Sequence, residues 1–424
     1  MIRVKGKATM YILPGYVTFH KETDKIYIRS LIYHNVVALT DAGMKEEFEK
    51  IVGAGSQKLD TELAVFLHEQ GLLLNKSEIN KDLERVIGLL NDVLVLTIMP
   101  TEGCNFRCSY CYENHKAVTM SRSTLDQIEK FIAEWAPRYK KLVIAWFGGE
   151  PTLCKDTVLE ISELVKKLQK ENKFTFASNM TTNGYLLDTS LFKRFYKAGV
   201  TNYQITIDGW NHNKTRPHIS GKDSLQTIIR NMLNISALPE DQYDFKIILR
   251  HNILLGDEDY SWYDYLYRLF GKDKRFEVLV RAVGNWGGES VKNLPLLKHG
   301  LMEDALKKHI AYLDEIGMKC SNHRDGLLSQ VCYASYPHSM VFRADGRIEK
   351  CTVALNHSEN QIGRIDAEKG VLFENSANER WSSLKLRQEC YTCPRILQCA
   401  NMRCKKTEII DNKTFRCCDK EQWI

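Results

Sequence analysis

Three cysteines, Cys104, Cys108 and Cys111, have the type and spacing in this 424-residue chain that most clearly indicate chemistry. Three residues separate the first pair and two separate the second, so one loop could place the sulfurs at three corners of a cubic iron–sulfur cluster. Thiolate is the soft ligand that such clusters require. The fourth iron would have no protein ligand and could coordinate a small molecule. The alternatives are a zinc loop, with His115 as a possible fourth ligand, and three unrelated thiols.

A repeating pattern of strands and helices is expected to position this loop. Apolar runs typical of strands occur at Val93–Ile98, Leu142–Phe147, Phe174–Phe176, Tyr203–Ile207, Phe245–Leu249 and Phe276–Val280. Between the first two, a helix is predicted whose apolar face carries Leu125, Ile128, Ile132 and Trp135. Ser123 and Asp126 have the spacing of a capping box at its start. Strands that alternate with helices indicate a parallel, barrel-like sheet.

Glycine and polar residues follow the ends of these predicted strands. They are Phe147–Pro151, Ser178, Asn179, Thr181–Gly184, Asp208, Gly209, Arg250–Asn252 and Gly284. Any one of them could be an ordinary turn residue. In β/α barrels the chemistry lies at the C-terminal ends of the strands. Together with the cysteine loop, these residues therefore predict one site on that face.

This combination of motifs resembles the radical S-adenosylmethionine (SAM) enzymes. The resemblance implies a [4Fe–4S] cluster on the cysteine loop, with SAM bound through its methionine part to the open iron. It also implies a partial (β/α)6 barrel. A guanidinium such as that of Arg250 suits the SAM carboxylate because its fork donates two parallel hydrogen bonds. The residues that the resemblance assigns to SAM are Tyr110, Gly148, Gly149, Glu150, Asn183, Asp208, Arg250 and Asn252.

The last third of the chain is rich in cysteine and resembles the SPASM extension, which holds two auxiliary [4Fe–4S] clusters. The resemblance implies that the first auxiliary cluster has the ligands Cys332, Cys351 and Cys404. The second would have Cys390, Cys393, Cys399 and either Cys417 or Cys418, of which Cys418 is favoured. His338 could complete the first cluster, or one iron there could be open. The alternative is a zinc ribbon built from Cys390, Cys393, Cys399 and Cys404.

Residues 1–90 are predicted to be a separate, winged-helix-like α+β module. The runs Tyr16–His20 and Lys25–Arg29 indicate a hairpin, a helix is expected to end at Gly71, and Leu72–Leu74 would be a strand. The module is either a scaffold cap or a peptide-recognition element to whose sheet a peptide adds a strand. The expected domains are therefore this module at 1–90, the barrel at 91–310 and the cysteine-rich SPASM domain at 311–424.

Composition excludes several classes of function. The 59 basic and 53 acidic residues give a net charge of only +6, so a nucleic-acid partner is not expected. There is no apolar run of the ~18 residues that span a membrane. The N-terminal residues lead into no signal-peptide core. We expect a cytoplasmic protein, in which thirteen cysteines favour metal binding over disulfides.

The resemblance implies a function as well as a fold. A reduced cluster would cleave SAM to a 5′-deoxyadenosyl radical that takes hydrogen from the substrate. The favoured interpretation is maturation of a ribosomally made precursor peptide with a leader segment, by a thioether or carbon–carbon crosslink. An anaerobic sulfatase-maturating-type oxidase, a peptide epimerase and a non-catalytic zinc-binding or peptide-docking protein are the alternatives. The expected electron donor is a flavodoxin or ferredoxin. The sequence assigns no general base.

Overall fold

The computed structural model describes residues 9–287, 291–292, 294–297, 299–322, 328–355, 357–384, 386–400, 402 and 404–412. The chain divides into two compact units. We call the first the N-terminal unit, which comprises residues 1–91, 325–335 and 382–404. We call the second the barrel unit, which comprises residues 92–324, 336–381 and 405–424. These units group the chain differently from the ranges 1–90, 91–310 and 311–424, which stay a prediction.

The N-terminal unit is an α+β module, as predicted. The antiparallel sheet has the order β1-β2-β3, with Val17 opposite Ser30 in the predicted hairpin. The predicted strand at Leu72–Leu74 is wrong, because only Leu74 forms an isolated bridge, with Ile12, and the leucines serve as buried core instead. The elements are β1 (Val17–Lys21), β2 (Ile26–Ser30), β3 (Val36–Leu39), α1 (Ala42–Ala54), α2 (Glu62–Glu69), α3 (Lys76–Gly88) and α12 (Ile396–Cys399).

The barrel unit is built on parallel strands, which confirms the predicted partial barrel. Strands β4 to β9 lie side by side in sequence order, each parallel to the next. The strands are β4 (Val93–Ile98), β5 (Lys141–Trp146), β6 (Thr175–Thr182), β7 (Val200–Thr206), β8 (Lys246–Ile253) and β9 (Phe276–Ala282). The helices among them are α4 (Arg122–Trp135), α5 (Lys155–Glu171), α6 (Thr189–Lys197), α7 (His212–Thr215), α8 (Ser224–Ser236), α9 (Ser261–Phe270) and α10 (His299–Glu315).

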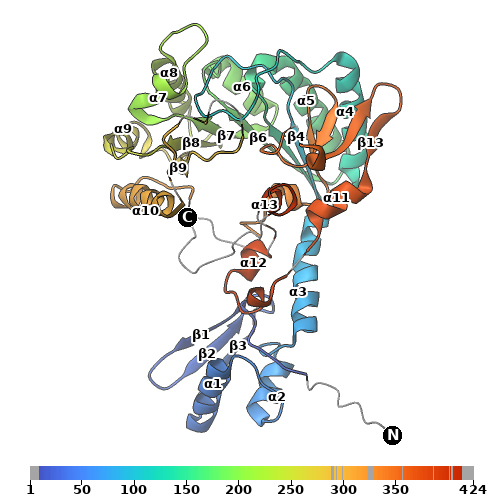
Figure 1. Cartoon of the computed structure of the whole chain (residues 1–424), viewed down its shortest axis with the longest axis vertical. Helices are drawn as coiled ribbons and strands as arrows, with labels where there is room; N and C mark the ends of the chain where they lie inside the picture. The colour runs from blue at the N-terminus through green and yellow to red at the C-terminus, as the bar shows by residue number, and fades with distance from the viewer. Residues whose placement is uncertain are drawn as a thin grey trace. The chain divides into compact units, whose positions relative to one another are not determined.

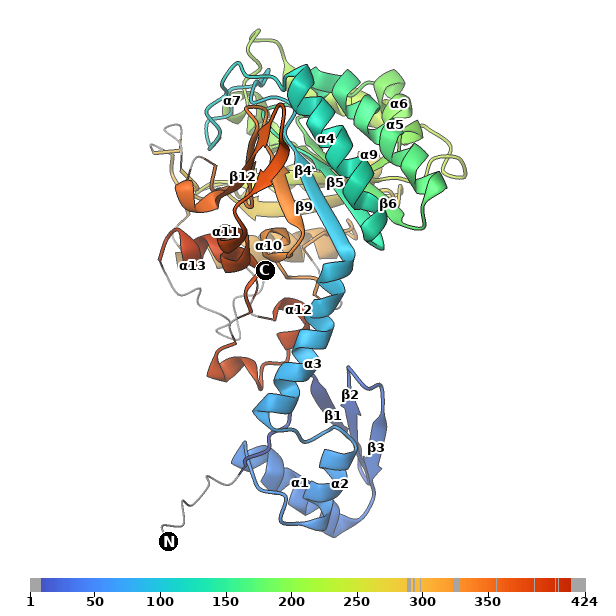
Figure 2. The ribbon, with the colours of Figure 1, turned by 90° about the vertical axis from the view of Figure 1, so that its right-hand side faces the viewer.

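Helices cover the outer face of this sheet. Figures 1 and 2 show α4, α5 and α6 packed side by side over β4 to β6. The apolar face of α4 is buried as predicted, with Leu125, Ile128 and Ile132 in the core. The helix is capped two residues earlier than the expected Ser123, since the Ser121 hydroxyl accepts the backbone N–H of Thr124 at 3.1 Å. In the described part of the chain, no helix is long and apolar enough to cross a membrane.

Two strands extend further than their apolar runs suggest. β6 continues to Thr182, and β8 continues to Ile253. Thr181, Thr182, Arg250 and Asn252 are therefore strand residues, not residues of the following turns. Alternate residues of a strand point to the same face, so Arg250 and Asn252 face one side and His251 the other.

A second group of strands extends the barrel sheet beyond β4. β10 pairs with β4 in parallel, and β11, β12 and β13 follow as antiparallel neighbours. β10 and β11 therefore separate β12 from the first barrel strand. A turn that contains Asp345 and Gly346 joins β10 to β11. The remaining elements are β10 (Ser339–Phe342), β11 (Arg347–Glu349), β12 (Gln361–Asp366), β13 (Gly370–Phe373), α11 (Asn375–Ser382) and α13 (Lys405–Ile409).

A buried ion-pair network holds this added hairpin to the cysteine loop. The side chain of Arg343 is 2% exposed and donates from Nε to Glu102 Oε1 at 3.0 Å. It also donates from Nη1 to both carboxylate oxygens of Glu349 at 3.1 Å. Glu102 lies two residues before Cys104. The hairpin and the beginning of the loop are therefore fixed to each other by charge.

Replacing Arg343 with Met should destabilise the barrel unit strongly. Buried Glu102 would lose its cation and Glu349 would keep only Arg347, at 3.3 Å, and leaving one member of a buried pair unpaired costs about 3–5 kcal/mol. Urea unfolding followed by circular dichroism measures the loss. Arg364→Met is the matched control, because Arg364 lies exposed on β12. Equal stability of the two variants would contradict the structural role given to Arg343.

Candidate active site

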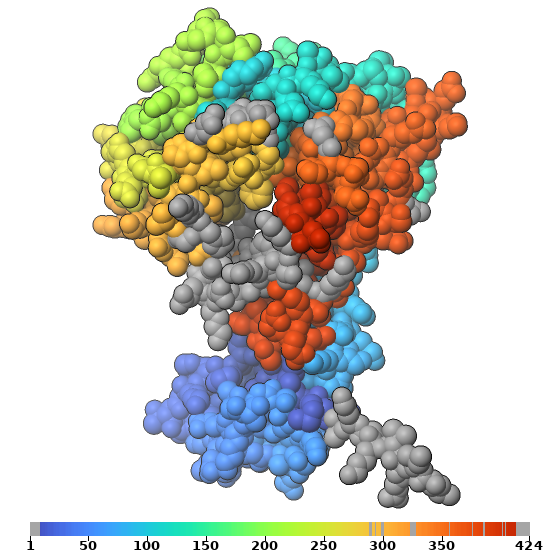
Figure 3. Space-filling model, in the orientation of Figure 1, coloured from blue at the N-terminus to red at the C-terminus, as the bar shows by residue number. Residues whose placement is uncertain are grey.

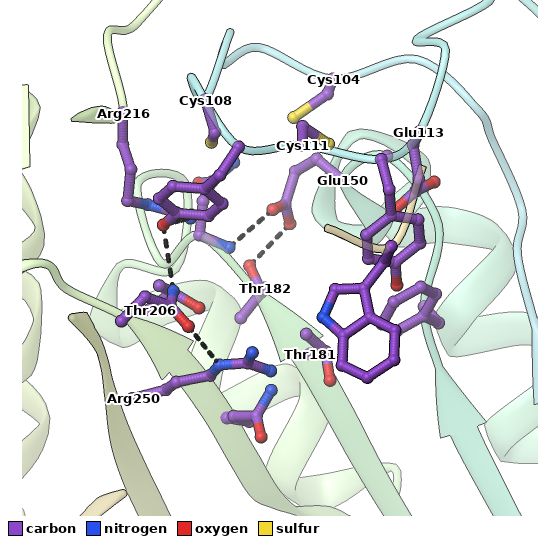
Figure 4. A pocket seen from close by; sticks show the side chains of 18 of the residues that line it. Cys104, Cys108, Cys111, Glu113, Glu150, Thr181, Thr182, Thr206, Arg216 and Arg250 are labelled. Carbon is purple, nitrogen blue, oxygen red and sulfur yellow. Dashed lines mark hydrogen bonds between the residues drawn. The ribbon is translucent and has the colours of Figure 1, made fainter. Parts of the chain in front are cut away.

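The three predicted cluster ligands lie together on one wall of a cavity in the barrel unit. Cys104, Cys108 and Cys111 line an open cavity of about 150 Å³, together with residues from the ends of β5 to β9. Figure 4 shows the three sulfurs along the same loop, with Thr206 and Arg250 on the opposite side. The sequence prediction that the cysteine loop and the strand ends share one site is consistent with this geometry.

The chemistry of the thiols fits a cluster. Burial raises the pKa of Cys104 and of Cys111 to about 12, and it raises the pKa of Cys108 as well. A bare thiol here would therefore be neutral at pH 7, and a bound cation is needed to hold thiolates. Among the described residues, no three His, Cys, Asp or Glu side chains are placed to hold a single metal ion. In a cubane each thiolate binds its own iron, so the sulfurs need not converge on one point.

Two glycines bring the loop after β5 directly against the cysteine loop. A Cβ on Gly149 would lie 2.1 Å from the carbonyl oxygen of Gly103. Gly148 has a φ of +111°, and a Cβ there would lie 2.5 Å from the oxygen of Thr101. Both distances are shorter than any real contact. The predicted role of these glycines was to let SAM approach the backbone, and the structure adds that they let two loops of the chain approach each other.

The Glu150 carboxylate fastens the same loop to the end of β6. Its Oε1 accepts the hydroxyl protons of Thr152 and Thr182, each at 2.6 Å, and its Oε2 accepts the backbone N–H of Asn183 at 2.7 Å. Burial raises the pKa of Glu150, although these hydrogen bonds oppose the shift. Figure 4 shows Glu150 directed at Thr182. The side chain therefore positions the part of the cavity wall to which it belongs.

The Tyr110 hydroxyl gathers groups from three elements. It donates to Asp208, which follows β7. It accepts from Arg216 Nη1 at 2.9 Å and from Asn252 Nδ2, on β8, at 3.0 Å. Asp208 also accepts the backbone N–H of Asn252 at 3.2 Å. Tyr110 lies between the second and third cysteines, so this network sets where the loop sits above the strand ends.

Arg250 is oriented by its neighbour and keeps donors for a ligand. Its Nε donates to Asn252 Oδ1 at 2.8 Å, and its side chain lines the cavity. Burial lowers the pKa of Arg250, the direction expected when a cation loses solvent. The structure records no carboxylate of the described residues paired with this guanidinium. A carboxylate ligand in the cavity would supply that partner.

Most of the predicted SAM residues line this one cavity: Tyr110, Gly148, Gly149, Glu150, Asn183, Arg250 and Asn252. Asp208 does not line it, but holds Tyr110 and Asn252 from behind. Cys351 lies in the barrel unit, whereas Cys332, Cys390, Cys393, Cys399 and Cys404 lie in segments of the N-terminal unit. The ring of His338 packs against Tyr139, with centroids 4.9 Å apart. Cys417 and Cys418 lie outside the described residues. The auxiliary ligand sets stay a prediction.

Thr206, Gln204 and Glu113 line the cavity and were not predicted, whereas His115 was considered only as a possible zinc ligand. Thr206 and Gln204 are at alternate positions of β7. Because alternate residues of a strand point to the same face, they could have been found once the strand was known. Glu113, two residues after Cys111, has its pKa raised to about 7 by burial, with Arg343 opposing the shift. His115 has a φ of +44°, and neither ring nitrogen has a hydrogen-bond partner among the described residues. Trp286 follows β9.

Comparison with known proteins identifies the barrel. Residues 98–277 match the family model described as the Radical SAM superfamily. The match includes the cysteine loop and strands β5 to β8. It predicts SAM and a [4Fe–4S] cluster as cofactors, which is consistent with the cysteine loop and the cavity beside it.

Curated relatives match this domain over part of their length. A putative glycyl-radical enzyme activating enzyme of Methanocaldococcus jannaschii is 32% identical over 164 residues, which is 37% of this chain and 57% of that protein. A GTP 3′,8-cyclase of Actinobacillus pleuropneumoniae is 29% identical over 141 residues, 32% of this chain and 38% of that protein. The chain thus spans about half the length of these relatives.

Solved structures resemble a larger part of the chain. A structure of anSMEcpe with bound AdoMet has a TM-score of 0.56 at 19% identity and covers 76% of this chain and 88% of its own. Streptococcus suis SuiB has a TM-score of 0.52 at 13% identity and covers 93% of this chain and 95% of its own. At these identities the likeness shows a shared fold.

Removing the Tyr110 hydroxyl should lower the unfolding free energy of the barrel unit. In Tyr110→Phe, the buried Asp208 loses a donor and Asn252 loses an acceptor, which costs about 1–3 kcal/mol of unfolding free energy. Chemical denaturation measures the change. Tyr265→Phe, on α9, is the control, because the structure records only ring contacts for Tyr265. A Tyr110→Phe variant as stable as this control would show that the network carries no energy.

Proposed function

We propose that the chain is a radical SAM enzyme that matures a ribosomally made precursor peptide through a thioether or carbon–carbon crosslink. The observation that carries the proposal is the cavity in which three thiols face the guanidinium of Arg250. The fold likeness to SuiB supports the choice of a peptide substrate, because it extends over 93% of the chain and SuiB has been solved with the precursor peptide SuiA.

The side chains of the cavity have distinct tasks in this proposal. Cys104, Cys108 and Cys111 would hold the [4Fe–4S] cluster. Arg250, aligned by Asn252, would bind the carboxylate of SAM, and the backbone at Gly148 and Gly149 would receive its amino group. When bound, cluster and SAM supply a radical able to remove hydrogen from carbon. The protein's own part is to bind, orient and exclude water.

Clusters bound by the C-terminal cysteines would accept the electron that leaves the substrate. Oxidative crosslinking removes two hydrogens, so an electron acceptor is needed once SAM has taken one hydrogen atom. Two auxiliary clusters on the predicted ligand sets would supply it. Cys351 lies near enough to Tyr112 to contribute to the raised pKa of that phenol, for which burial is the largest cause. A flavodoxin or ferredoxin in the cytoplasm would reduce the cluster on the cysteine loop.

The N-terminal unit would bind the leader segment of the precursor peptide. β3 pairs only with β2 among the described strands, so it forms an edge of the sheet. Val36 on this strand is 57% exposed. An extended peptide can add to such an edge through main-chain hydrogen bonds. This supports a recognition role over that of a scaffold cap.

A second candidate is a protein-modifying oxidase of the sulfatase-maturating type. The likeness to anSMEcpe favours it, because its TM-score of 0.56 is higher than that of SuiB. The two functions differ in the product, since an oxidase of this type leaves no bond between two residues of the substrate.

Mass spectrometry distinguishes the functions. The anaerobically reconstituted full chain is incubated with SAM, dithionite and the peptide encoded by the nearest short reading frame. A loss of two hydrogens per event, with fragments that stay linked, is the expected result. A peptide whose mass is unchanged in H2O, but which takes up deuterium when the reaction is run in D2O, would indicate an epimerase instead. The variant with Cys104, Cys108 and Cys111 all changed to Ala should form no 5′-deoxyadenosine, and activity that persists in it would refute the assignment.

Replacing Arg250 with Met should weaken SAM binding. A charge-assisted bidentate hydrogen bond is worth about 1.5–3 kcal/mol, so the Kd for SAM should rise roughly 10- to 150-fold. Equilibrium dialysis with the reconstituted chain and labelled SAM measures it. Arg230→Met is the control, since Arg230 is exposed on α8. If both variants bind SAM as tightly as the parent chain, Arg250 does not contact the carboxylate.

A further inference from the structure

The cysteine segment of residues 388–404 packs against the beginning of the chain. Gly15 is buried, and its backbone N–H donates to the carbonyl of Tyr391 at 2.8 Å. A Cβ on Gly15 would lie 1.8 Å from the carbonyl oxygen of Cys393. No side chain can be accommodated at that distance. The backbone of residue 15 therefore forms one wall of the turn between Cys390 and Cys393.

Helix α3 holds the same segment from a second direction. The Tyr391 hydroxyl donates to Asn80 Oδ1 at 3.0 Å. Lys76 Nζ donates to Gln388 and lies 5.4 Å from the centroid of the Tyr391 ring. These contacts join residues more than 300 positions apart in the sequence. Figure 3 shows the orange atoms of this cysteine segment directly beside the blue atoms of the N-terminal residues, all within the N-terminal unit.

A third stretch, residues 328–332, runs alongside the segment. The backbone N–H groups of Leu328 and Gln330 donate to the carbonyls of Leu397 and Gln398, at 2.7 and 2.9 Å. Cys332 donates in the same way to Met402 at 3.0 Å. The ladder places Cys332 beside the stretch that carries Cys399 and Cys404. In this unit, cysteines from two regions of the chain are thus ordered on a frame that the first 91 residues provide.

We propose that residues 9–91, the N-terminal module, are a structural part of the site at which Cys390, Cys393 and Cys399 would hold an auxiliary cluster. The module's backbone at Gly15 and its helix α3 fix the turn on which these thiols lie, so ordering the turn by metal also stabilises the module. This coupling follows because a ligand that binds only the folded arrangement stabilises all of it. The identity of the metal as an auxiliary [4Fe–4S] cluster rests on the proposed function, whereas the packing does not.

The substitution Gly15→Ala in the full chain tests the inference. Gly53→Ala is the matched control, because Gly53 lies in α1 of the same module with no atom within 4 Å of its Cβ position. Tyr391→Phe is a milder second variant that removes only the hydrogen bond to Asn80. Each protein is reconstituted anaerobically with iron and sulfide. The measurements are metal per chain, 5′-deoxyadenosine formation, and alkylation of each cysteine in the metal-free chain.

We expect Gly15→Ala to lose about four irons of roughly twelve, the content of one cubane out of three. In the metal-free chain, alkylation of Cys390, Cys393 and Cys399 should be at least about tenfold faster, because local opening exposes them. Tyr391→Phe should show the same direction with a smaller change. SAM cleavage should persist in all three variants, since the cysteine loop lies in the barrel unit.

Full metal content and unchanged alkylation in Gly15→Ala would overturn the inference. A parent chain that holds no metal at these cysteines would overturn it too. If the parent holds zinc there and Gly15→Ala loses it, the inference stands and the auxiliary cluster of the proposed function fails. Loss of SAM cleavage in the parent chain itself would refute the proposed function without affecting the packing result.

Discussion

The site depends on the close approach of two backbones, that of Gly149 after β5 and that of Gly103 before the first cysteine. Only a residue without Cβ permits this approach, because the added atom would lie 2.1 Å from a carbonyl oxygen. The backbone N–H of Glu150 donates to Gly103 at 2.9 Å, so the approach is also bonded. This contact sets the depth at which the three thiols sit above the strand ends.

Buried charges around this contact are satisfied within the protein, which makes the loop rigid. Glu150 uses both oxygens on the loop after β5 and on β6, and Arg343 joins Glu102 to Glu349. Such fully bonded networks fix one arrangement, because leaving any member unpaired in a medium of low dielectric is costly. Arg250 differs, since among the described residues its guanidinium has a hydrogen-bond partner only at Nε, which donates to Asn252. The surrounding protein therefore holds the Arg250 guanidinium in place, while its remaining N–H groups can donate to a ligand in the cavity.

Sequence patterns predicted the barrel strands well, because these depend on local periodicity. The register of the parallel strands brings most of the predicted site residues to one cavity. Strand ends were missed where polar residues such as Thr182 and Arg250 continue the ladder into the cavity. Asp208 was expected to contact the ligand, but it lies behind Tyr110 and Asn252, which line the cavity. Sequence spacing cannot distinguish a residue in the cavity wall from one behind it. Glu113 has no spacing signal and His115 suggested only a zinc ligand, since both side chains acquire their environment only when the loop folds over the strands. The contact of Gly15 with Cys393 joins opposite ends of the chain and no local pattern could indicate it.

The parallel pairing of β10 with β4 has a consequence for the integrity of the barrel. In an isolated run of β/α units, the first strand would present a row of unpaired N–H and C=O groups to other molecules, the usual starting point of edge-to-edge association. Here that row is occupied by a strand made some 240 residues later, and the edge moves outward to the short β13. A nascent chain released before β10 emerges would expose the unpaired edge of β4. The barrel is therefore protected against edge-to-edge association only late in synthesis.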